Sequence, residues 1–331
     1  MAEEPEPTDG SPSTHTPEES DQTPPGEVDQ TTPPDLVYHV DGESVPASEA
    51  TVNVHDRGFA YGDAVFETIR VYGGTPFRWD AHCDRLEDSA EALSLPLPCD
   101  RTELRARVVE TLAANDLREA AVKLSVTRGV DTRGLTPPTD PDPTVVITVS
   151  PLPRGGTDGE RVWDEPARLQ TAMTRRVPDR ALPSAAKTHN YLNPILARLE
   201  TTVSDATEAL VLDTDGNVAE AATANLWFVA DDALRTPSLD GPVLPGITRE
   251  TVLDALADEE IPVEEGTYDP DDVRDADEAF LTSSIREVKP VATVDGVAVG
   301  GGPVTKLVST LYDALVERSC YADEELPADG E

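Results

Sequence analysis

The sequence contains 331 residues and carries a formal net charge of −39, from 65 acidic and 26 basic residues. A charge of this sign and size excludes general affinity for nucleic acids and for anionic membrane surfaces, because phosphate groups would repel the protein. Hydrophobic residues make up 38% of the chain and recur periodically, so most of a chain long enough for two domains should fold.

The acidic residues are spread over the whole length, and only four of the 26 basic residues are lysines. This composition resembles that of proteins from salt-loving archaea. There, dense carboxylates hold water and cations at the surface while molar salt screens their mutual repulsion. The alternative is an acidic interaction surface, but such surfaces usually come as blocks of like charge. We therefore expect a halophilic protein.

The three cysteines (Cys83, Cys99 and Cys320) have no metal-binding spacing and are odd in number, which indicates reduced thiols and no metal site. The chain has no apolar run of about 18 residues, and its N-terminus lacks a basic and then apolar signal pattern. We expect a soluble cytoplasmic protein.

Residues 1–34 contain nine acidic residues and eight prolines but no lysine or arginine. Such a segment cannot bury enough apolar surface to offset its ordering entropy, so we expect a disordered acidic tail. Residues 321–331 form a second acidic tail.

Residues 35–150 predict a small N-terminal domain that mixes helices and strands. In chain order we expect a strand at 36–40 with a hairpin turn at Asp41-Gly42, a strand at 51–55, a glycine-punctuated loop at 56–64, a strand at 66–72, a helix with Asp80 as its N-cap, a helix at 101–115, and strands at 121–127 and 144–149.

Proline and glycine at 151–160 predict an interdomain linker, and residues 161–320 a larger C-terminal domain. In this domain we expect strands at 168–174, 209–212, 218–220, 225–229, 278–282 and 290–294, helices after Lys187 and after Gly246, and a last helix at 304–317.

Lys187 lies among small residues, with an Asn-Tyr pair and an apolar helical run behind it. Such a context suits a lysine held away from water, which can act as a nucleophile. A lone lysine at a helix start is more often a surface residue, so the interpretation depends on partners elsewhere in the chain.

Several segments could supply those partners. The loop that opens a helix at Gly246, and the hydroxyls of Ser283 and Ser284 after a strand, both suit a phosphate group. Arg85 could add a bidentate clamp to the same phosphate. Glu220 follows a turn and precedes small residues, where a ring could approach the backbone. Each signal alone has a more ordinary explanation, such as a helix cap, a surface ion pair or a solvated carboxylate.

In this order the motifs resemble the class IV, or fold-type IV, pyridoxal-phosphate enzymes, which include branched-chain aminotransferases, D-amino acid aminotransferases and aminodeoxychorismate lyases. The resemblance runs from about Tyr38 to Val316. Its motifs are DRGFAYGDAVFETIRVY, HCDRL, AAKTHNYLN, VAEAATANLWF, LPGITRE and LTSSIREVKPV. It implies an α+β, two-domain, D-amino acid aminotransferase-like fold with pyridoxal 5′-phosphate between the domains. We expect a homodimer that acts on a small-molecule amino substrate.

The resemblance also implies roles for individual residues. Lys187 matches the catalytic lysine that binds the cofactor and moves the substrate's α-proton, and Glu220 matches the carboxylate paired with the pyridine nitrogen. The other implied cofactor-binding residues are Arg85, Tyr191, Ile247, Thr248, Ser283 and Ser284. Tyr61 and Arg133 match residues that bind the substrate.

The choice of reaction depends on a few positions. Branched-chain enzymes commonly have glycine where this chain has Thr68, and arginine in the strand position of Lys123. Arg133 stands where D-amino acid enzymes bind the substrate carboxylate, but Leu135 replaces its histidine partner. These positions favour an aminodeoxychorismate lyase, which forms 4-aminobenzoate and pyruvate. The alternatives are a branched-chain aminotransferase and then a D-amino acid aminotransferase. A non-catalytic acidic binding protein would need neither Lys187 nor Glu220.

Overall fold

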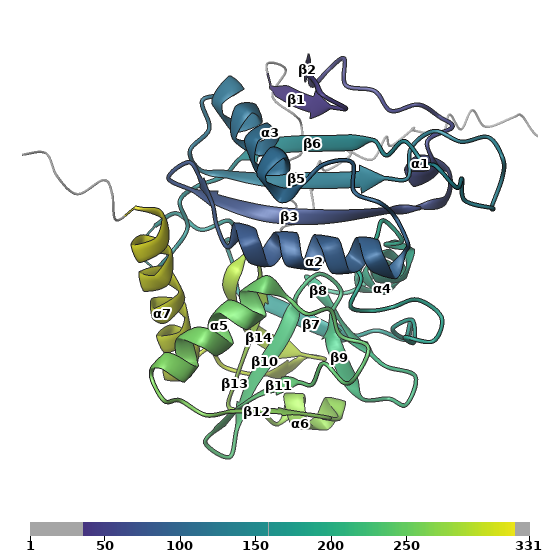
Figure 1. Ribbon diagram of the computed structural model, residues 1–331. Coiled ribbons are helices and arrows are strands. Elements are labelled where there is room, and N and C mark those ends of the chain that lie inside the picture. The colour runs from purple at the N-terminus through teal and green to yellow at the C-terminus, as the bar shows by residue number, and fades with distance from the viewer. Residues whose placement is uncertain (1–35, 158, 322–331) are drawn as a thin grey trace, which may run out of the picture.

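The computed structural model describes residues 36–157 and 159–321, which form two sheets with separate cores (Figure 1). This confirms the expectation of a two-domain α+β protein. The predicted disordered tail at 1–34 lies outside the described residues, and so does the predicted acidic tail at 321–331, apart from Tyr321. The predicted linker at 151–160 coincides with the end of the last strand of the first sheet and the start of the connection to the second.

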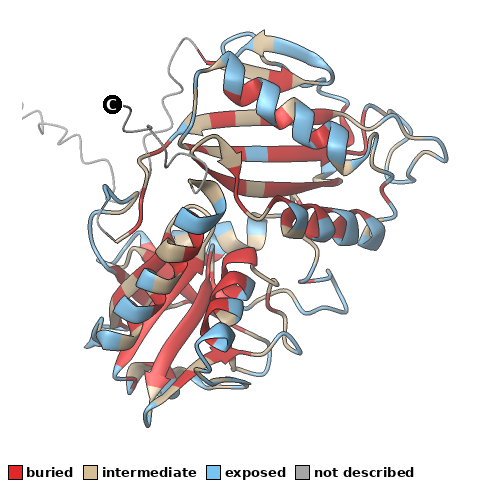
Figure 2. Cartoon of the chain, turned by 60° about the vertical axis from the view of Figure 1, so that its left-hand side comes forward, coloured by how far each residue is buried: buried red, intermediate tan, exposed pale blue. Residues whose placement is uncertain are grey.

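The first sheet has six strands in the order β2-β1-β6-β5-β3-β4, and all neighbouring strands are antiparallel. Helices α2 and α3 pack against it and enclose an apolar core (Figure 2). Its elements are β1 (Val37–Val40), β2 (Glu43–Pro46), α1 (Arg57–Tyr61), β3 (Ala64–Tyr72), β4 (Thr75–Pro76), α2 (Trp79–Ala92), α3 (Arg101–Ala114), β5 (Ala120–Thr127) and β6 (Val145–Pro151).

Strand β3 is buried on both faces, and this double burial makes it the wall shared by the two domains. On one face Val65, Ile69 and Val71 join the core under α2. Because successive side chains of a strand alternate, Phe66 and Thr68 lie on the opposite face, toward the second domain. Farther along that face, Tyr72 donates a hydrogen bond of 2.8 Å to Glu287 of the second sheet.

The second sheet has nine strands, eight of them in the order β12-β11-β10-β13-β14-β7-β8-β9, with β15 paired to β14. The pairs β11–β12, β14–β7 and β7–β8 are parallel. Its elements are β7 (Ala167–Thr171), α4 (Leu192–Thr201), β8 (Glu208–Leu212), β9 (Val218–Ala221), β10 (Asn225–Ala230), β11 (Ala233–Pro237), α5 (Ile247–Asp258), β12 (Val263–Gly266), α6 (Pro270–Arg274), β13 (Glu278–Ser283), β14 (Glu287–Val294), β15 (Val297–Ala298) and α7 (Pro303–Cys320).

Helices α5 and α7 pack against each other and against the central strands of this sheet (Figure 1). Their apolar faces cover Trp227 and Phe280, whose rings stack with centroids 5.7 Å apart. The same cluster takes in Tyr72 and Phe77 of the first domain. An apolar seam therefore fixes the two sheets against each other.

Two predicted elements are wrong. Residues 51–55 do not form a strand: Val52 and Val54 are exposed, and β2 (Glu43–Pro46) takes the edge of the sheet instead. Helix α2 starts at Trp79 rather than after Asp80, and its N-cap is Arg78, which makes no side-chain capping bond. Asp80 lies in the first turn, where its charge favours the positive end of the helix.

In the described part of the chain, no helix is long and apolar enough to cross a membrane. The three cysteines are free thiols. No group of three or more His, Cys, Asp or Glu side chains that could hold a metal ion occurs within residues 36–157 and 159–321.

Candidate active site

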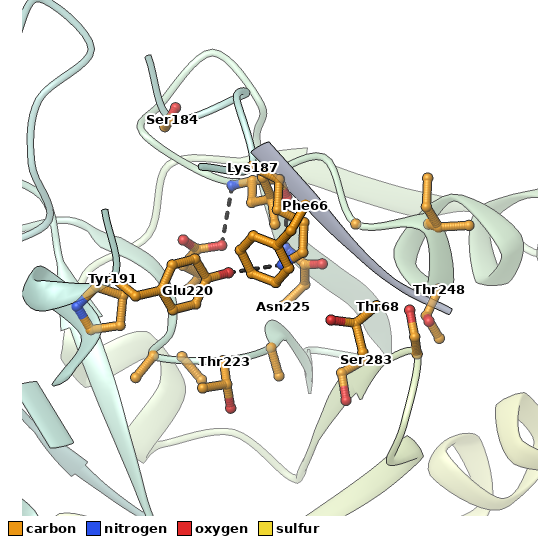
Figure 3. Close-up of a pocket in the computed structure, with 18 of the residues that line it drawn as sticks. Phe66, Thr68, Ser184, Lys187, Tyr191, Glu220, Thr223, Asn225, Thr248 and Ser283 are labelled. Carbon is orange, nitrogen blue, oxygen red and sulfur yellow. Dashed lines mark hydrogen bonds between the residues drawn. The ribbon is translucent and has the colours of Figure 1, made fainter. Parts of the chain in front are cut away.

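A cavity of about 660 Å³ lies where β3 and α2 of the first domain face the second domain (Figure 3). Eight of the ten predicted site residues line it, although they come from segments far apart in the sequence. These residues are Arg85, Lys187, Tyr191, Glu220, Ile247, Thr248, Ser283 and Ser284.

Lys187 is positioned mainly by backbone contacts with the first domain. Its N–H donates to the Ser89 hydroxyl at 2.9 Å, and its carbonyl accepts from the Phe66 N–H at 3.0 Å. The amine Nζ donates to the Tyr191 hydroxyl at 2.8 Å and lies 4.4 Å from the centre of the Phe66 ring. Because the backbone is fixed at both ends of the residue, the amine is held in the cavity, and no carboxylate among the described residues forms a salt bridge with it.

Glu220 ends in the same part of the cavity as Lys187 and Tyr191 (Figure 3). Its Oε1 lies 2.9 Å from Nε of Arg176, and its Oε2 accepts from the Leu244 N–H at 3.1 Å. Burial raises the pKa of Glu220, while the charge of Arg176 and the hydrogen bond from Leu244 oppose that rise. Arg176 therefore helps to keep an anion at this place.

Arg85 is held by a buried carboxylate from β3. Its Nε and Nη2 donate to the two oxygens of Glu67 at 2.8 and 2.6 Å, and His82 contacts the same carboxylate at 2.7 Å. Burial alone would raise the pKa of Glu67, but Arg85 and His82 outweigh it and lower the pKa to about 2. The two-pronged face of Arg85 is thus already occupied, and the guanidinium meets the cavity with its remaining N–H groups.

The first turn of α5 presents free backbone N–H groups to the cavity at Ile247 and Thr248. The loop before it is tied down by Asn225, which donates to the Leu244 carbonyl at 2.9 Å, and by Arg85, which donates to the Pro245 carbonyl at 2.8 Å. A Cβ on Gly246 would lie 1.9 Å from the Asn225 amide oxygen, so only glycine allows this approach. Such a helix N-terminus favours a phosphate.

The turn between β13 and β14 supplies another edge of the cavity. Ser283 and Ser284 line it, and the Ser283 hydroxyl accepts from the Arg286 N–H at 3.3 Å. Thr248 lies on the opposite side of the cavity from Lys187 and Glu220, with Ser283 between (Figure 3). The cavity therefore offers phosphate donors at one end and an amine beside a carboxylate at the other.

This arrangement fits a flat aromatic aldehyde that carries a phosphate. The amine of Lys187 suits the aldehyde, Glu220 suits a protonated ring nitrogen, and the donors at Arg85 and the first turn of α5 suit a dianion.

The structure does not bring the two predicted substrate-binding residues into this cavity. Tyr61 is 45% exposed and lies under the guanidinium of Arg57, 5.1 Å from ring centre to Cζ. The side chain of Arg133 is 62% exposed and pairs with Asp131 two residues away at 2.9 Å. Within a single chain, neither residue reaches a substrate held beside Lys187.

Three cavity or cavity-supporting residues are missed by the sequence analysis as site residues: Glu67, Arg176 and Asn225. Glu67 and Asn225 lie inside the recognised motifs, and their spacing from Thr68 and Glu220 could have marked them. Arg176 carries no sequence signal, because the fold alone brings it to Glu220.

The sequence model of the family described as Amino-transferase class IV matches residues 64–294. A protein of Methanocaldococcus jannaschii, provisionally named as a branched-chain-amino-acid aminotransferase, is 37% identical over 84% of this chain and 94% of its own length. D-alanine aminotransferase of Listeria monocytogenes is 34% identical over 87% of this chain and 97% of its own. Aminodeoxychorismate lyase of Bacillus subtilis is 30% identical over 86% and 96%.

Solved structures give the same result. The branched-chain amino acid aminotransferase of the source abbreviated T.th., crystallised with pyridoxamine 5′-phosphate, superposes with a TM-score of 0.79 at 30% identity, covering 88% of this chain and 97% of that one. The 4-amino-4-deoxychorismate lyase from Pseudomonas aeruginosa superposes with a TM-score of 0.73 at 32% identity, covering 86% and 100%.

Proposed function

Because this chain belongs to the class IV aminotransferase family, whose cofactor is pyridoxal 5′-phosphate, we propose that it is an aminodeoxychorismate lyase. The substrate would be 4-amino-4-deoxychorismate, and the products 4-aminobenzoate and pyruvate. The observation that carries this proposal is the polar wall made by Thr68 and Lys123 beside Phe66.

Thr68 lines the cavity, and Lys123 is its register partner across β3 and β5. The amines of Lys123 and Lys187 lie 5.0 and 4.4 Å from the centre of the same Phe66 ring. Burial and the neighbouring charge of Lys187 both lower the pKa of Lys123. A hydroxyl and an ammonium at this wall suit a substrate with carboxylates better than an aliphatic side chain, because an apolar group would leave them without partners.

In this proposal the cofactor lies with its phosphate at Arg85, Ile247, Thr248 and Ser284 and its ring nitrogen at Glu220. Pyridoxal phosphate, when bound, supplies an electron sink for the carbon that bears the substrate's amine. Lys187 removes the proton from that carbon, and Tyr191 orients the amine by its 2.8 Å hydrogen bond. The enolpyruvyl C–O bond then breaks, the six-membered ring becomes aromatic, and the released enol takes up a proton and becomes pyruvate.

The second candidate is a branched-chain aminotransferase, favoured by the 37% identity to the Methanocaldococcus jannaschii protein. A transaminase must hold two substrates in turn in one pocket, and its aliphatic substrate would have to pack against Thr68. A D-amino acid aminotransferase comes third, since Arg133 pairs with Asp131 and has Leu135 in place of a histidine partner.

We also propose that the enzyme is a homodimer. Helix α4 exposes the apolar side chains of Leu192, Ile195, Leu196 and Leu199, and such a stripe on a charged surface marks a contact with another protein. A second copy would also give the exposed Tyr61 and Arg133 a role, because each protomer could present them to the cavity of its partner. Light scattering after gel filtration in molar salt tests this: a monomer under those conditions contradicts the proposal.

The test of the reaction is a direct comparison of two assays on the pure holoenzyme. One assay measures 4-aminobenzoate from 4-amino-4-deoxychorismate generated by a synthase, and the other measures glutamate from leucine and 2-oxoglutarate. We expect 4-aminobenzoate. Efficient glutamate formation without 4-aminobenzoate overturns the proposal and supports the branched-chain enzyme.

A further inference from the structure

The cavity lining is basic although the chain as a whole is strongly acidic. Five basic residues but only one acidic residue, Glu220, line it among the described residues; the basic residues are Arg85, Arg176, Lys187, Arg198 and Arg286. Arg85 is matched by Glu67 and Arg176 by Glu220. After this pairing, Lys187 and the two arginines Arg198 and Arg286 remain to be explained.

Arg198 and Arg286 converge on one carboxylate. Nη1 of Arg286 lies 3.0 Å and Nη1 of Arg198 3.8 Å from the same oxygen of Glu208, whose side chain is 1% exposed. The Thr223 hydroxyl donates to this oxygen at 2.8 Å. Two guanidinium groups thus share one buried negative charge, which leaves an excess of one positive charge at the cavity wall.

Arg286 has unused donors that face the cavity. Its backbone is fixed on both sides, since its N–H donates to the Ser283 hydroxyl and its carbonyl accepts from the Trp163 indole at 3.2 Å. Within the described residues, neither Nε nor Nη2 of Arg286 has a hydrogen-bond partner, and the side chain is 21% exposed. A guanidinium with free N–H groups is the preferred partner of a carboxylate.

Lys289 adds to the positive charge behind this wall. It is a buried residue of β14 outside the cavity lining, and its amine lies 5.9 Å from the Trp163 ring centre. Burial and then the charge of Arg286 lower the pKa of Lys289 to about 8. The nearby acids Asp164 and Glu165 are exposed residues outside the lining, and Glu165 pairs with Arg168.

The shared carboxylate places this cluster at the Thr223 side of the cavity. Thr223 and Thr248 lie on opposite sides of the cavity (Figure 3). The cluster is therefore separate from the phosphate donors of Arg85 and the first turn of α5, and a second anion can bind there at the same time.

We propose that Arg286 and Arg198, held by Glu208, form a carboxylate subsite that selects amino or keto acids with a second carboxylate. The inference rests on the proposed function in one respect, because it takes this cavity as the place where the substrate binds. It extends to either reaction, since 4-amino-4-deoxychorismate, glutamate and 2-oxoglutarate are all dicarboxylates.

The test compares two five-carbon acids, glutarate with two carboxylates and valerate with one. Their binding to the holoenzyme is followed by Trp163 fluorescence and by the visible absorbance of the cofactor, at one ionic strength. We expect glutarate to bind about 10-fold more tightly than valerate. Arg286→Gln should abolish this preference and leave valerate binding unchanged, and Arg286→Lys should restore part of it.

Arg168→Gln is the matched control, because it removes an arginine of the same domain that lies outside the cavity lining. It should keep the full preference for glutarate. Equal affinities for the two acids in the wild type, or an unchanged preference in Arg286→Gln, overturn the subsite.

The outcome is distinct from that of the proposed function. A preference for glutarate that depends on Arg286, in an enzyme that forms no 4-aminobenzoate, supports the subsite and removes the lyase. Formation of 4-aminobenzoate with the same KM in the wild type and Arg286→Gln supports the lyase and removes the subsite.

Discussion

The two ends of the cavity handle positive charge differently. At the phosphate end, Glu67 binds Arg85 through both oxygens, at 2.8 and 2.6 Å. At the Thr223 end, two arginines and a nearby lysine surround the single carboxylate of Glu208. A balanced buried pair can hold a scaffold in place by itself, whereas an unbalanced cluster needs a counter-ion from outside. The difference separates a residue group that supports the cofactor from one that awaits a substrate.

Breaking the balanced pair should give the largest effect. Glu67→Gln leaves the buried guanidinium of Arg85 without its charge partner, which should cost about 3 to 5 kcal/mol of stability. We expect a lower denaturation midpoint and weaker cofactor binding, measured by titrating the apoprotein with pyridoxal phosphate.

The pH dependence of Glu67 gives a second readout. Its pKa in the folded protein is about 2, below the ordinary value of 4.5, so its stabilising effect is present above pH 4.5 and is lost as the pH falls toward 2. Glu67→Gln should lack this acid-induced loss. Glu87→Gln, which removes an exposed partner of Arg101, serves as the control and should behave like the wild type. An unaltered midpoint in Glu67→Gln would contradict the scaffold role.

Glu220→Gln tests the carboxylate that faces the ring nitrogen. It removes the partner of both Arg176 and the protonated ring, so we expect turnover to fall about 100-fold, equivalent to about 3 kcal/mol. The measurement is kcat at saturating cofactor, together with the visible spectrum as a function of pH. Glu200→Gln is a control outside the cavity lining. Equal kcat values for Glu220→Gln and the wild type would remove Glu220 from the site.

Salt should act in opposite directions on the surface and on the unbalanced cluster. With a net charge of −39, molar KCl should raise the melting temperature by screening carboxylate repulsion. The same salt should weaken glutarate binding, because Arg198 and Arg286 are partly exposed, and should leave the buried Glu67–Arg85 pair intact. A melting temperature that does not change with salt would show that the acidic surface has another purpose.

The smallest effect concerns Lys289. Because its pKa falls from 10.5 to about 8 on folding, the folded state disfavours the charged amine, and stability should rise as the pH increases from 8 to 10.5. Lys289→Met should be more stable than the wild type below pH 8 and should lose this rise. Melting curves between pH 7 and 10.5 check it, and a parallel pH dependence in the two proteins argues against a buried charged amine.

The sequence was sufficient to predict the cofactor end of the site. Lys187, Glu220, Thr248 and their neighbours come from short motifs whose glycines, hydroxyls and spacing carry the chemistry, and all of them line one cavity. The roles assigned to these residues stay predictions.

Contacts made across the fold were harder to predict. Arg176 meets Glu220, and Arg198 meets Glu208, only because the tertiary structure brings separate segments together. A local pattern also misled: residues 51–55 alternate like a strand, but no strand in the described part of the chain pairs with them. Tyr61 and Arg133 fit the family motif, yet a single chain leaves them outside the cavity.

The central claim, that the cofactor is bound at Lys187 in this cavity, can be tested by one measurement. The chain has only four lysines: Lys123, Lys187, Lys289 and Lys306. Borohydride reduction of the holoenzyme followed by peptide mass mapping should therefore assign the phosphopyridoxyl group without ambiguity. We expect the adduct on Lys187 alone, and none there after Lys187→Ala. An adduct on Lys123, Lys289 or Lys306, with Lys187 unmodified, would contradict the account.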